Sequence, residues 1–451
     1  MKRILAFVLV AAMVLSLAAC SKDEKKDTNN GGGTETTTAP TTAPDNTDKP
    51  SDEGGLLDKA VELTLWDIAV AGDGNRPAYD AALAELKTKY PNVTIKENSV
   101  QNDDYKPMIK SAVAANELPD IFFTWSCAFL GDFVSADKVY CLDSTLQPYI
   151  DKGELFPVML NNTTYNGKHY GVPTTMNIVG LFANMDLLAK VGYTDIPATY
   201  EDLIACCDKL VAAGIIPFGC AAKEDQTWCV TEYLEPIIEK TIGAKAMNDI
   251  FVNGATWDNA GIKDAVDKFQ AMINGGYFDP AGTALTNDEV KANFIAGKYA
   301  FYQNGTWNCG EFAGTAGLNV KVGEFPVIDS SKSQLGELIG GPSDTLAVAA
   351  SSANAEAAAA YAAELGRSIC KNGYLAGSGL PAWNLTVDDS GINALTKAVS
   401  QICNNAKDYV LFGDTAMHAE DAQIYLEYVS KVYGGQLNGE QFVSGLKNDI
   451  R

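Results

Sequence analysis

The sequence predicts an α/β fold in two lobes, on three observations. Strand-like and helix-like runs alternate from Val61 to Trp125, an order that is typical of a mainly parallel or mixed sheet flanked by helices. Roughly 390 residues follow a polar N-terminal stretch, a length that favours two domains or lobes with ample core. Breaks rich in Gly and Pro, at Gly340-Gly341-Pro342 and at 377–381, divide the later chain into separate segments.

The predicted elements follow from hydrophobic periodicity. Val61–Trp66 alternates apolar and polar residues as a half-buried strand does, and Tyr79–Tyr90 carries apolar residues at helical spacing. A helix is predicted over 198–212, which Thr199, followed three residues later by Asp202, is expected to cap. Other strands are predicted at 93–97, 121–123, 165–173 with a turn at 166–167, 179–183, 215–220, 299–302, 320–327 and 345–350, and other helices at 105–116, 184–191, 260–274, 353–370 and over most of 392–450.

The N-terminus has the three parts of a secretory signal. Lys2 and Arg3 form a charged region, an apolar stretch spans 4–17, and small residues precede Cys20 in the sequence LAAC. This box is typical of bacterial lipoproteins, in which the signal 1–19 is removed and Cys20 carries the lipid; an ordinary signal peptide with a chance cysteine is the alternative. The pattern predicts a protein held by lipid on the extracellular face of the cytoplasmic membrane.

Residues 20–58 are predicted to form a lipidated, disordered tether. They are rich in Thr, Pro, Gly, Ser and Asp, a composition that cannot bury enough apolar surface to fold. The formal net charge of −23 argues against nucleic acid as a partner and favours a neutral or cationic ligand over an anionic one. The protein is expected to act as a monomer.

Nine cysteines follow Cys20, an odd number without a CxxC pair. Pairing of Cys127 with Cys141, or of Cys220 with Cys229, stays open for a secreted protein, but burial as small apolar side chains is favoured. The sequence has only two histidines and no paired metal-ligand spacing, so we expect no metal and no cofactor.

The stretch Asn293–Asn308, NFIAGKYAFYQNGTWN, is the most informative about function. A short amphipathic run ends at Gly297, a strand-like run ends at Asn304-Gly305, and Trp307 follows the turn. This order puts a flat ring at a strand end, where ligands collect in open α/β sheets. A tryptophan packed in the core is the alternative.

Seven motifs in order make the chain resemble bacterial extracellular solute-binding proteins of family 1, the sugar-binding lipoproteins of ABC importers, whose best-known member is maltose-binding protein. The resemblance covers Glu62–Leu446. Its marks are KYPNVTIK (89–96), ELPDIFFTW (117–125), YNGKHYGVP with GLFANMDLLAKVGY (165–193), PATYEDL (197–203), GYFDP (276–280), FIAGKYAFYQNGTW (294–307) and IGGPSDTLAV (339–348).

The resemblance implies a two-lobed periplasmic-binding-protein fold, similar to type II, with a sugar in the cleft between the lobes. Each lobe would hold a mixed or parallel sheet flanked by helices, and the chain crossings would form a hinge near 171–175, 339–343 and 377–381. Lobe 1 is expected at 59–172 with 342–378, and lobe 2 at 173–341 with 379–451. The implied partners are a carbohydrate and the permease subunits of the importer.

Sugar binding needs flat rings for the C–H faces of the ligand and polar side chains for its hydroxyls. The resemblance places Trp125, Trp228 and Trp307 as such rings and turns Asp344, at the second crossing, toward the cleft. Glu224 or Asp225 would supply one further carboxylate. The predicted substrate-binding residues are Trp66, Asp67, Trp125, Asp225, Trp228, Trp307, Asp344 and Trp383.

Several residues have a structural interpretation beside the functional one. Asp67 could cap a helix or be a solvated loop acid, and Asp120 at a strand start is expected to be structural. Arg76 could reach a hydroxyl or form a surface pair. His418 could reach the cleft, but a helix surface is favoured for it, and Trp257 is expected in the packing before a helix.

Two other function classes stay open. A surface glycosidase also uses tryptophans and paired acids, but the separation of such a pair cannot be seen in a sequence, and no hydrolase motif occurs. Binding of a peptide, polyamine or other cationic ligand is compatible with the negative charge. The stretch GDTAMHAEDA (413–422) departs from the maltose-binding pattern, which argues against a long maltodextrin. We predict a binding protein without catalytic activity.

Overall fold

A computed structural model describes residues 55–223 and 226–450 of the chain. The predicted signal, Cys20, most of the predicted tether and the pair Glu224 and Asp225 lie outside these residues. Within them, no helix is both long enough and apolar enough to cross a membrane.

One mixed sheet runs through the described chain in the order β2-β1-β3-β10-β6-β8-β7. β1 is parallel to β2 and β3, as the alternation of strands and helices predicts, whereas β10 and β6 are antiparallel to each other. The strands are β1 Val61–Asp67, β2 Val93–Ser99, β3 Ile121–Trp125, β4 Thr164–Tyr165, β5 Lys168–His169, β6 Val172–Asn184, β7 Ile216–Phe218, β8 Tyr299–Gly305, β9 Val320–Gly323, β10 Glu337–Val348, β11 Leu380–Pro381 and β12 Asp408–Val410.

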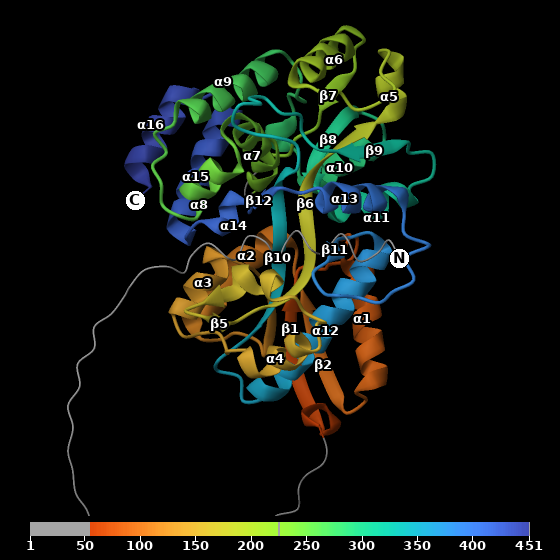
Figure 1. Cartoon of the computed structure of the whole chain (residues 1–451), viewed down its shortest axis with the longest axis vertical. Helices are drawn as coiled ribbons and strands as arrows, with labels where there is room; N and C mark the ends of the chain where they lie inside the picture. Colours follow the sequence, from red (N-terminus) through yellow and green to blue (C-terminus); the bar gives the residue numbers. More distant parts are fainter. Residues whose placement is uncertain (1–54, 224–225, 451) are drawn as a thin grey trace, which may run out of the picture. The chain divides into compact units, whose positions relative to one another are not determined.

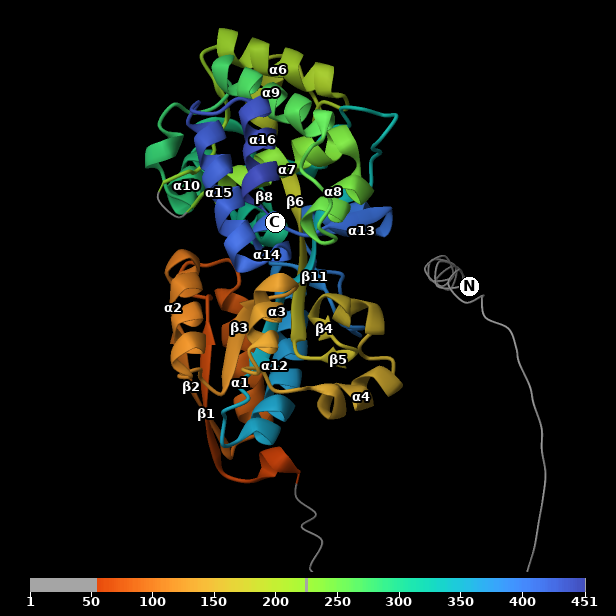
Figure 2. The ribbon, with the colours of Figure 1, turned by 90° about the vertical axis from the view of Figure 1, so that its left-hand side faces the viewer.

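Helices cover the sheet in two groups, one on each side of the middle of β6 and β10 (Figures 1 and 2). The first group is α1 Arg76–Lys89, α2 Asn102–Ala115, α3 Ala128–Ser135, α4 Asp143–Asp151 and α12 Ala355–Ala376. The second is α5 Met185–Lys190, α6 Tyr200–Ala212, α7 Trp228–Ile242, α8 Ala244–Phe251, α9 Ala260–Asn274, α10 Asn287–Ile295, α11 Cys309–Gly314, α13 Ala394–Asn404, α14 Gly413–Ala416, α15 Ala419–Tyr433 and α16 Gly439–Asp449.

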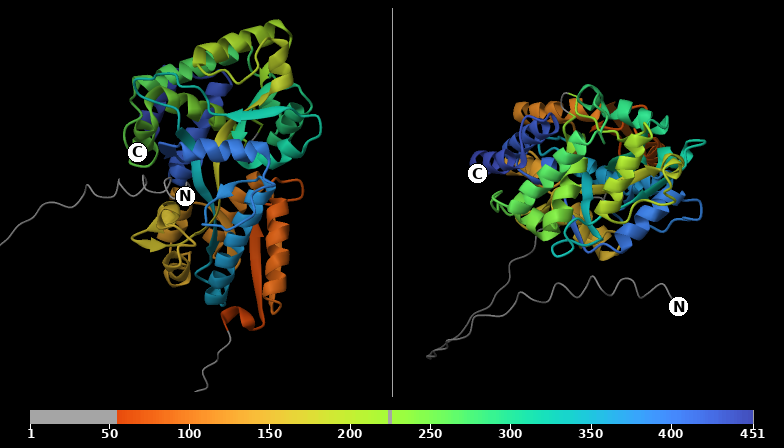
Figure 3. Two further views of the ribbon diagram at one scale, coloured as in Figure 1. Left: turned by 45° about the vertical axis from the view of Figure 1, so that its right-hand side comes forward. Right: turned by 90° about the horizontal axis from the view of Figure 1, so that it is seen from above.

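The buried apolar side chains divide in the same way, which defines two lobes. Lobe 1 has one cluster, drawn from 57–172 and 346–383. Lobe 2 has two clusters, and each of them takes residues both from 176–339 and from 380–446. Seen from a third direction, β6 still joins an upper and a lower body (Figure 3). The two-lobed α/β architecture expected from the sequence is therefore present.

Local signals place several of these elements where the sequence predicts them. The Oγ1 of Thr199 accepts from the backbone N–H of Asp202 at 3.1 Å, so this residue caps α6. Asn166 and Gly167, with φ of 52° and 74°, turn β4 into β5, as a two-residue hairpin of this type requires. The helix predicted at 353–370 runs six residues further than expected, to Ala376, and Gly377, the first residue of the predicted break at 377–381, ends it with φ of 80°.

Three strands pass between the lobes side by side. Gly341 lies opposite Asn177 in β6, and Leu380 of β11 lies opposite Met176 on the same strand. The ladder between β10 and β6 is irregular between Gly341 and Asp344. Gly340 and Gly341 have φ of 128° and 139°, values that favour glycine. Backbone of this kind, in strands that both lobes share, is suited to act as a hinge.

Candidate functional site

Trp228 and Trp307 stand together on the side of lobe 2 that meets lobe 1. Their ring centroids lie 6.3 Å apart with 55° between the planes, and both side chains are partly buried. Trp307 directly follows the buried strand β8, and a Cβ added at Gly305 would lie 2.0 Å from its ring. A glycine at this strand end therefore lets the ring fold back over the backbone. The predicted ring at a strand end exists.

Trp228 is the first residue of α7 and reaches across to lobe 1. Its indole Nε1 donates to Oδ1 of Asp103 at 2.9 Å. In lobe 1, Gly74 approaches Trp307 so closely that an added Cβ would lie 3.0 Å from the carbonyl oxygen of Trp307. Each of the two tryptophans is thus in contact with lobe 1.

Trp125 ends β3 in lobe 1 and is 7% exposed. Its ring makes edge contacts with Phe123 and Phe129 at centroid distances of 5.0 and 5.1 Å. The Nζ of Lys106 lies 4.8 Å from the ring centroid and 2.6 Å from Oδ2 of Asp414 in lobe 2. In this closed arrangement, the ring is covered by a cation that bridges to the opposite lobe.

Carboxyl groups gather around Tyr79 where lobe 1 meets the hinge. Burial and the carboxyls of Asp67, Asp344 and Asp73 raise the pKa of the Tyr79 hydroxyl. Asp67 ends β1 and is 0% exposed, and Asp344 lies in β10 opposite Thr175 of β6. The Oγ1 of Thr175 donates to Oδ2 of Asp344 at 3.3 Å. Two of the predicted carboxylates are thereby brought to one region.

Burial raises the pKa of both predicted acids. Oδ1 of Asp67 accepts from the N–H of Ala69 at 2.9 Å, whereas Oδ2 is buried without a hydrogen-bond partner among the described residues. Burial, with help from Glu97, raises the pKa of Asp67 to about 7, although the Ser99 side chain works in the opposite direction. Burial likewise raises the pKa of Asp344 to about 6. Groups of this kind can exchange hydrogen bonds with a polar ligand.

Comparison with known proteins decides the family. The family described as bacterial extracellular solute-binding protein matches residues 72–367, well over half of the chain. The chain belongs to this family. A solute-binding protein of this family is an extracellular or periplasmic receptor, and none of the relatives described below is named as an enzyme.

Two curated relatives are similar over much of this solute-binding protein. An uncharacterized ABC transporter extracellular-binding protein of Pyrococcus horikoshii is 25% identical over 334 residues, 72% of this chain and 69% of that protein. A probable sugar-binding periplasmic protein of Mesorhizobium japonicum is 26% identical over 288 residues, 61% of this chain and 59% of that protein. The second match leaves about two fifths of the relative uncovered.

Solved structures agree with the fold. A protein from work on xylan utilization by the thermophilic bacterium Caldanaerobius polysaccharolyticus is 32% identical, with a TM-score of 0.81 over 87% of this chain and all of that one. A chitin oligosaccharide binding protein is 22% identical, with a TM-score of 0.79 over 86% of this chain and 98% of its own. A maltose-bound protein of T. maritima is 17% identical, with a TM-score of 0.70 over 86% and 98%. The last two support the two-lobed fold alone.

Trp383 is placed differently from the other predicted rings of this solute-binding protein. It is 2% exposed, it packs edge-on against Tyr149 at 5.4 Å, and its Nε1 donates to the carbonyl oxygen of Pro173 at 2.7 Å. The ring lies in the core of lobe 1, although the sequence allotted 379–451 to lobe 2. Because its faces and its N–H are already used, we leave Trp383 out of the proposed site. Trp66, partly buried near the end of β1, stays in it.

Asp120, Arg76 and Trp257 have the structural roles that the sequence offered for them. Both oxygens of Asp120 are engaged, Oδ2 by Thr64 and Oδ1 by the Ser352 hydroxyl at 2.6 Å. Arg76 is held inside lobe 1 by Glu97 at 2.9 Å and Asp80 at 2.8 Å. Trp257 is 3% exposed in the lobe 2 core, as expected.

His418 contacts lobe 1, although the sequence favours an ordinary helix surface for it. Its side chain is 74% exposed, but its Nδ1 lies 2.8 Å from Oδ1 of Asp132 in lobe 1. Asp103, Lys106 and Asp414 were missed for a similar reason. Each looks like an ordinary surface charge in a helical segment, and only the approach of the lobes gives it a partner in the opposite lobe.

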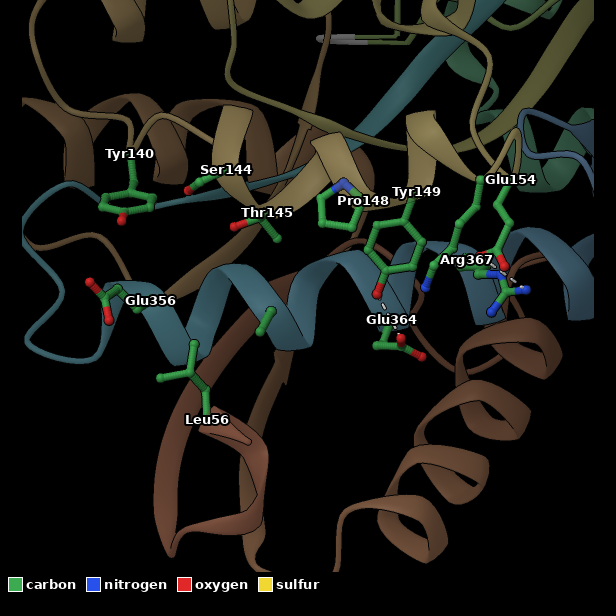
Figure 4. A pocket seen from close by; sticks show the side chains of 12 residues that line it. Leu56, Tyr140, Ser144, Thr145, Pro148, Tyr149, Glu154, Glu356, Glu364 and Arg367 are labelled. Atoms are coloured by element: carbon green, nitrogen blue, oxygen red, sulfur yellow. Dashed lines mark hydrogen bonds and ion pairs between the residues drawn. The ribbon is translucent and has the colours of Figure 1, made fainter. Parts of the chain in front are cut away.

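A cavity of about 470 Å³ opens elsewhere, between α4, α12 and the start of the described chain (Figure 4). Four of its polar side chains form two pairs: the Tyr149 hydroxyl donates to Glu364 at 2.6 Å, and Arg367 lies 3.4 Å from Glu154. It contains none of the predicted tryptophans, so its size alone does not make it the ligand site.

Cysteines and metal ligands give no sign of a second site. All nine cysteines between 55 and 450 are free thiols, including both pairs that the sequence left open. In the same part of the chain, no group of three His, Cys, Asp or Glu side chains is placed to hold a metal ion.

Proposed function

We propose that this protein is the substrate-binding lipoprotein of an ABC importer, that it captures a carbohydrate between its lobes, and that it catalyses no reaction. The main support for this proposal is the pair Trp228 and Trp307 at the lobe boundary, with the carboxyls of Asp67 and Asp344 near the hinge. Aromatic faces suit the C–H faces of a sugar ring, and carboxyls suit its hydroxyls.

Closure of the lobes would be the functional event. A ligand that contacts both lobes binds the closed form better than the open one, so it shifts the population toward closure. The closed form would then present one continuous surface to the permease subunits. The site residues that we propose are Trp66, Asp67, Trp125, Trp228, Trp307 and Asp344, with Asp225 as a seventh that lies outside the described residues.

The ligand class can be narrowed. The solved structure at 32% identity comes from xylan utilization, which supports an oligosaccharide built from xylose as the first candidate. The carboxyls of Asp67, Asp73 and Asp344, which all raise the pKa of the Tyr79 hydroxyl, keep a polyamine as the second candidate, because a group of carboxylates attracts a cation.

A thermal-shift screen tests the proposal directly. We would compare xylo-, chito- and malto-oligosaccharides, their monosaccharides, short peptides and spermidine, each at one millimolar or a similar concentration. A ligand that binds only the folded protein raises its stability by RT ln(1+[L]/Kd), about 2.7 kcal/mol at 100 times Kd. A rise with a saccharide alone is expected. A rise with spermidine and with no saccharide would replace the sugar by a cation.

Two further measurements complete the test. Calorimetry on the best saccharide gives the stoichiometry, which we expect to be one per chain. Chromatography of the same mixture after a long incubation should return the saccharide intact; shortened products would show a glycosidase.

A further inference from the structure

The lobes touch through charged side chains on one side of the hinge. In lobe 1 these side chains come from α2 and α3. In lobe 2 they come from the segment that leads into α7 and from the region of α14 and α15. Figure 2 shows α3 of lobe 1 next to α14 of lobe 2. The three contacts are Asp103 with Gln226 and Trp228, Lys106 with Asp414, and Asp132 with His418 and the N–H of Ala419.

Asp103 is the best organised of the three. It lies in the first turn of α2, where the side chain of Gln101 accepts from its N–H at 2.7 Å and fixes its backbone. Its Oδ1 accepts from Nε1 of Trp228 at 2.9 Å and its Oδ2 from Nε2 of Gln226 at 2.6 Å. Both oxygens of one lobe 1 carboxylate therefore bind the segment that leads into α7 of lobe 2.

The partner segment is itself anchored. The Oε1 of Gln226 accepts from the N–H of Asn287 at the start of α10, at 2.5 Å. The ring of Trp228 lies against that of Trp307. A single carboxylate from lobe 1 thus holds the amide of Gln226 and the indole of Trp228 in one arrangement, and opening the lobes would release both.

We propose that Asp103 is a positioning residue for the ligand: on closure it fixes the indole of Trp228 in the orientation that stacks on the carbohydrate, and this contact slows ligand release. The inference rests on the proposed function. A bond between a carboxylate and an N–H is among the stronger hydrogen bonds, and here it forms only when the lobes meet. Its loss should therefore act on the dissociation rate more than on the association rate.

The test compares four variants with the wild type: Asp103→Ala, Trp228→Phe, the double variant, and Asp104→Ala. Trp228→Phe keeps an aromatic face but removes the N–H. Asp104 is the matched control, because it lies in the same turn of α2 and its side chain is exposed. Stopped-flow tryptophan fluorescence with the saccharide identified above gives both rate constants, and a thermal melt of each variant confirms folding.

We expect Asp103→Ala and Trp228→Phe each to raise the dissociation rate on the order of tenfold, with little change in association rate. The double variant should dissociate about as fast as Asp103→Ala, because each single substitution already removes the bond between Asp103 and the indole of Trp228. Asp104→Ala should match the wild type. The proposal is overturned if Asp103→Ala dissociates like Asp104→Ala, or if the two single effects multiply.

A measurement without ligand separates this inference from the proposed function. Small-angle X-ray scattering of the unliganded proteins should show a larger radius of gyration for Asp103→Ala than for Asp104→Ala, because the closing contact is lost. If the wild type binds no saccharide, the proposed function fails while scattering still tests the contact. Equal scattering curves, together with unchanged release of a bound saccharide, would refute the role of Asp103.

Discussion

The ring of Trp307 lies 6.3 Å from the ring of Trp228, although the two residues come from different elements of lobe 2. One follows the end of β8 and the other begins α7. A pair of tilted rings at the lobe boundary forms an aromatic corner, which can contact a sugar on two faces.

Trp307→Ala should weaken saccharide binding by roughly 1–3 kcal/mol, about five- to 150-fold in Kd, by analogy with the stacking of bases on aromatic side chains. Titration calorimetry measures the change. Stability should fall less, because the ring is only partly buried.

Trp383→Phe is the control for this substitution. It removes the bond from Nε1 to Pro173 in the core of lobe 1, so the melting temperature should fall while the Kd of the folded protein stays the same. If Trp307→Ala melts far lower than Trp383→Phe yet binds normally, Trp307 is a packing residue.

Stability should depend on pH through Asp67. Its pKa is about 7 in the folded protein, above the ordinary value of 3.8, so the folded state binds more protons than the unfolded state between these values. The free energy of unfolding therefore falls as pH rises from about 4 to about 7. Asp67→Asn cannot titrate and should flatten this part of the profile, as measured by urea denaturation at several pH values.

Several other buried acids, Glu232 and Glu235 among them, contribute in the same direction because burial raises the pKa of each. The informative quantity is therefore the difference between Asp67→Asn and the wild type across the pH range. A constant difference from pH 4 to pH 8 would show that Asp67 does not titrate in this range.

Gly340→Ala should disturb the hinge. An added Cβ would lie 2.3 Å from the carbonyl oxygen of Asn177, and φ at this position is 128°. Strained backbone of this kind costs of order 1–3 kcal/mol, and the free energy of unfolding should fall by about that amount. Gly391→Ala is the matched control, since an added Cβ there meets nothing within 4 Å. Equal urea midpoints for the two variants would contradict this role for Gly340.

Cys20 is expected to carry the lipid. In cells that express Cys20→Ala, the protein should leave the membrane fraction and appear in soluble form, because the thioether anchor cannot be made. Metabolic labelling with an alkyne fatty acid should mark the wild type and not the variant. Labelling of the variant at the wild-type level would rule out Cys20 as the lipidated residue.

The sequence by itself determined the local features of the fold. The turn at Asn166-Gly167 and the cap at Thr199 depend on residues within a few positions of each other, so their signals are readable without the rest of the chain. The same holds for the buried strand before Trp307. It also holds for the glycines of the hinge, whose backbone angles exclude most other residues. The family motifs, which are themselves local patterns in a fixed order, added the two-lobed arrangement.

Only the tertiary structure decided which side chains work together. Asp103 and Trp228 are 125 positions apart, and nothing near either residue indicates the other. Trp383 has the same residue type and a similar setting after a Gly and Pro break, yet it packs into the core of lobe 1. The reason is physical: contacts across the cleft depend on where the three crossing strands place two separate bodies, and a periodic pattern reports only the face that one element buries.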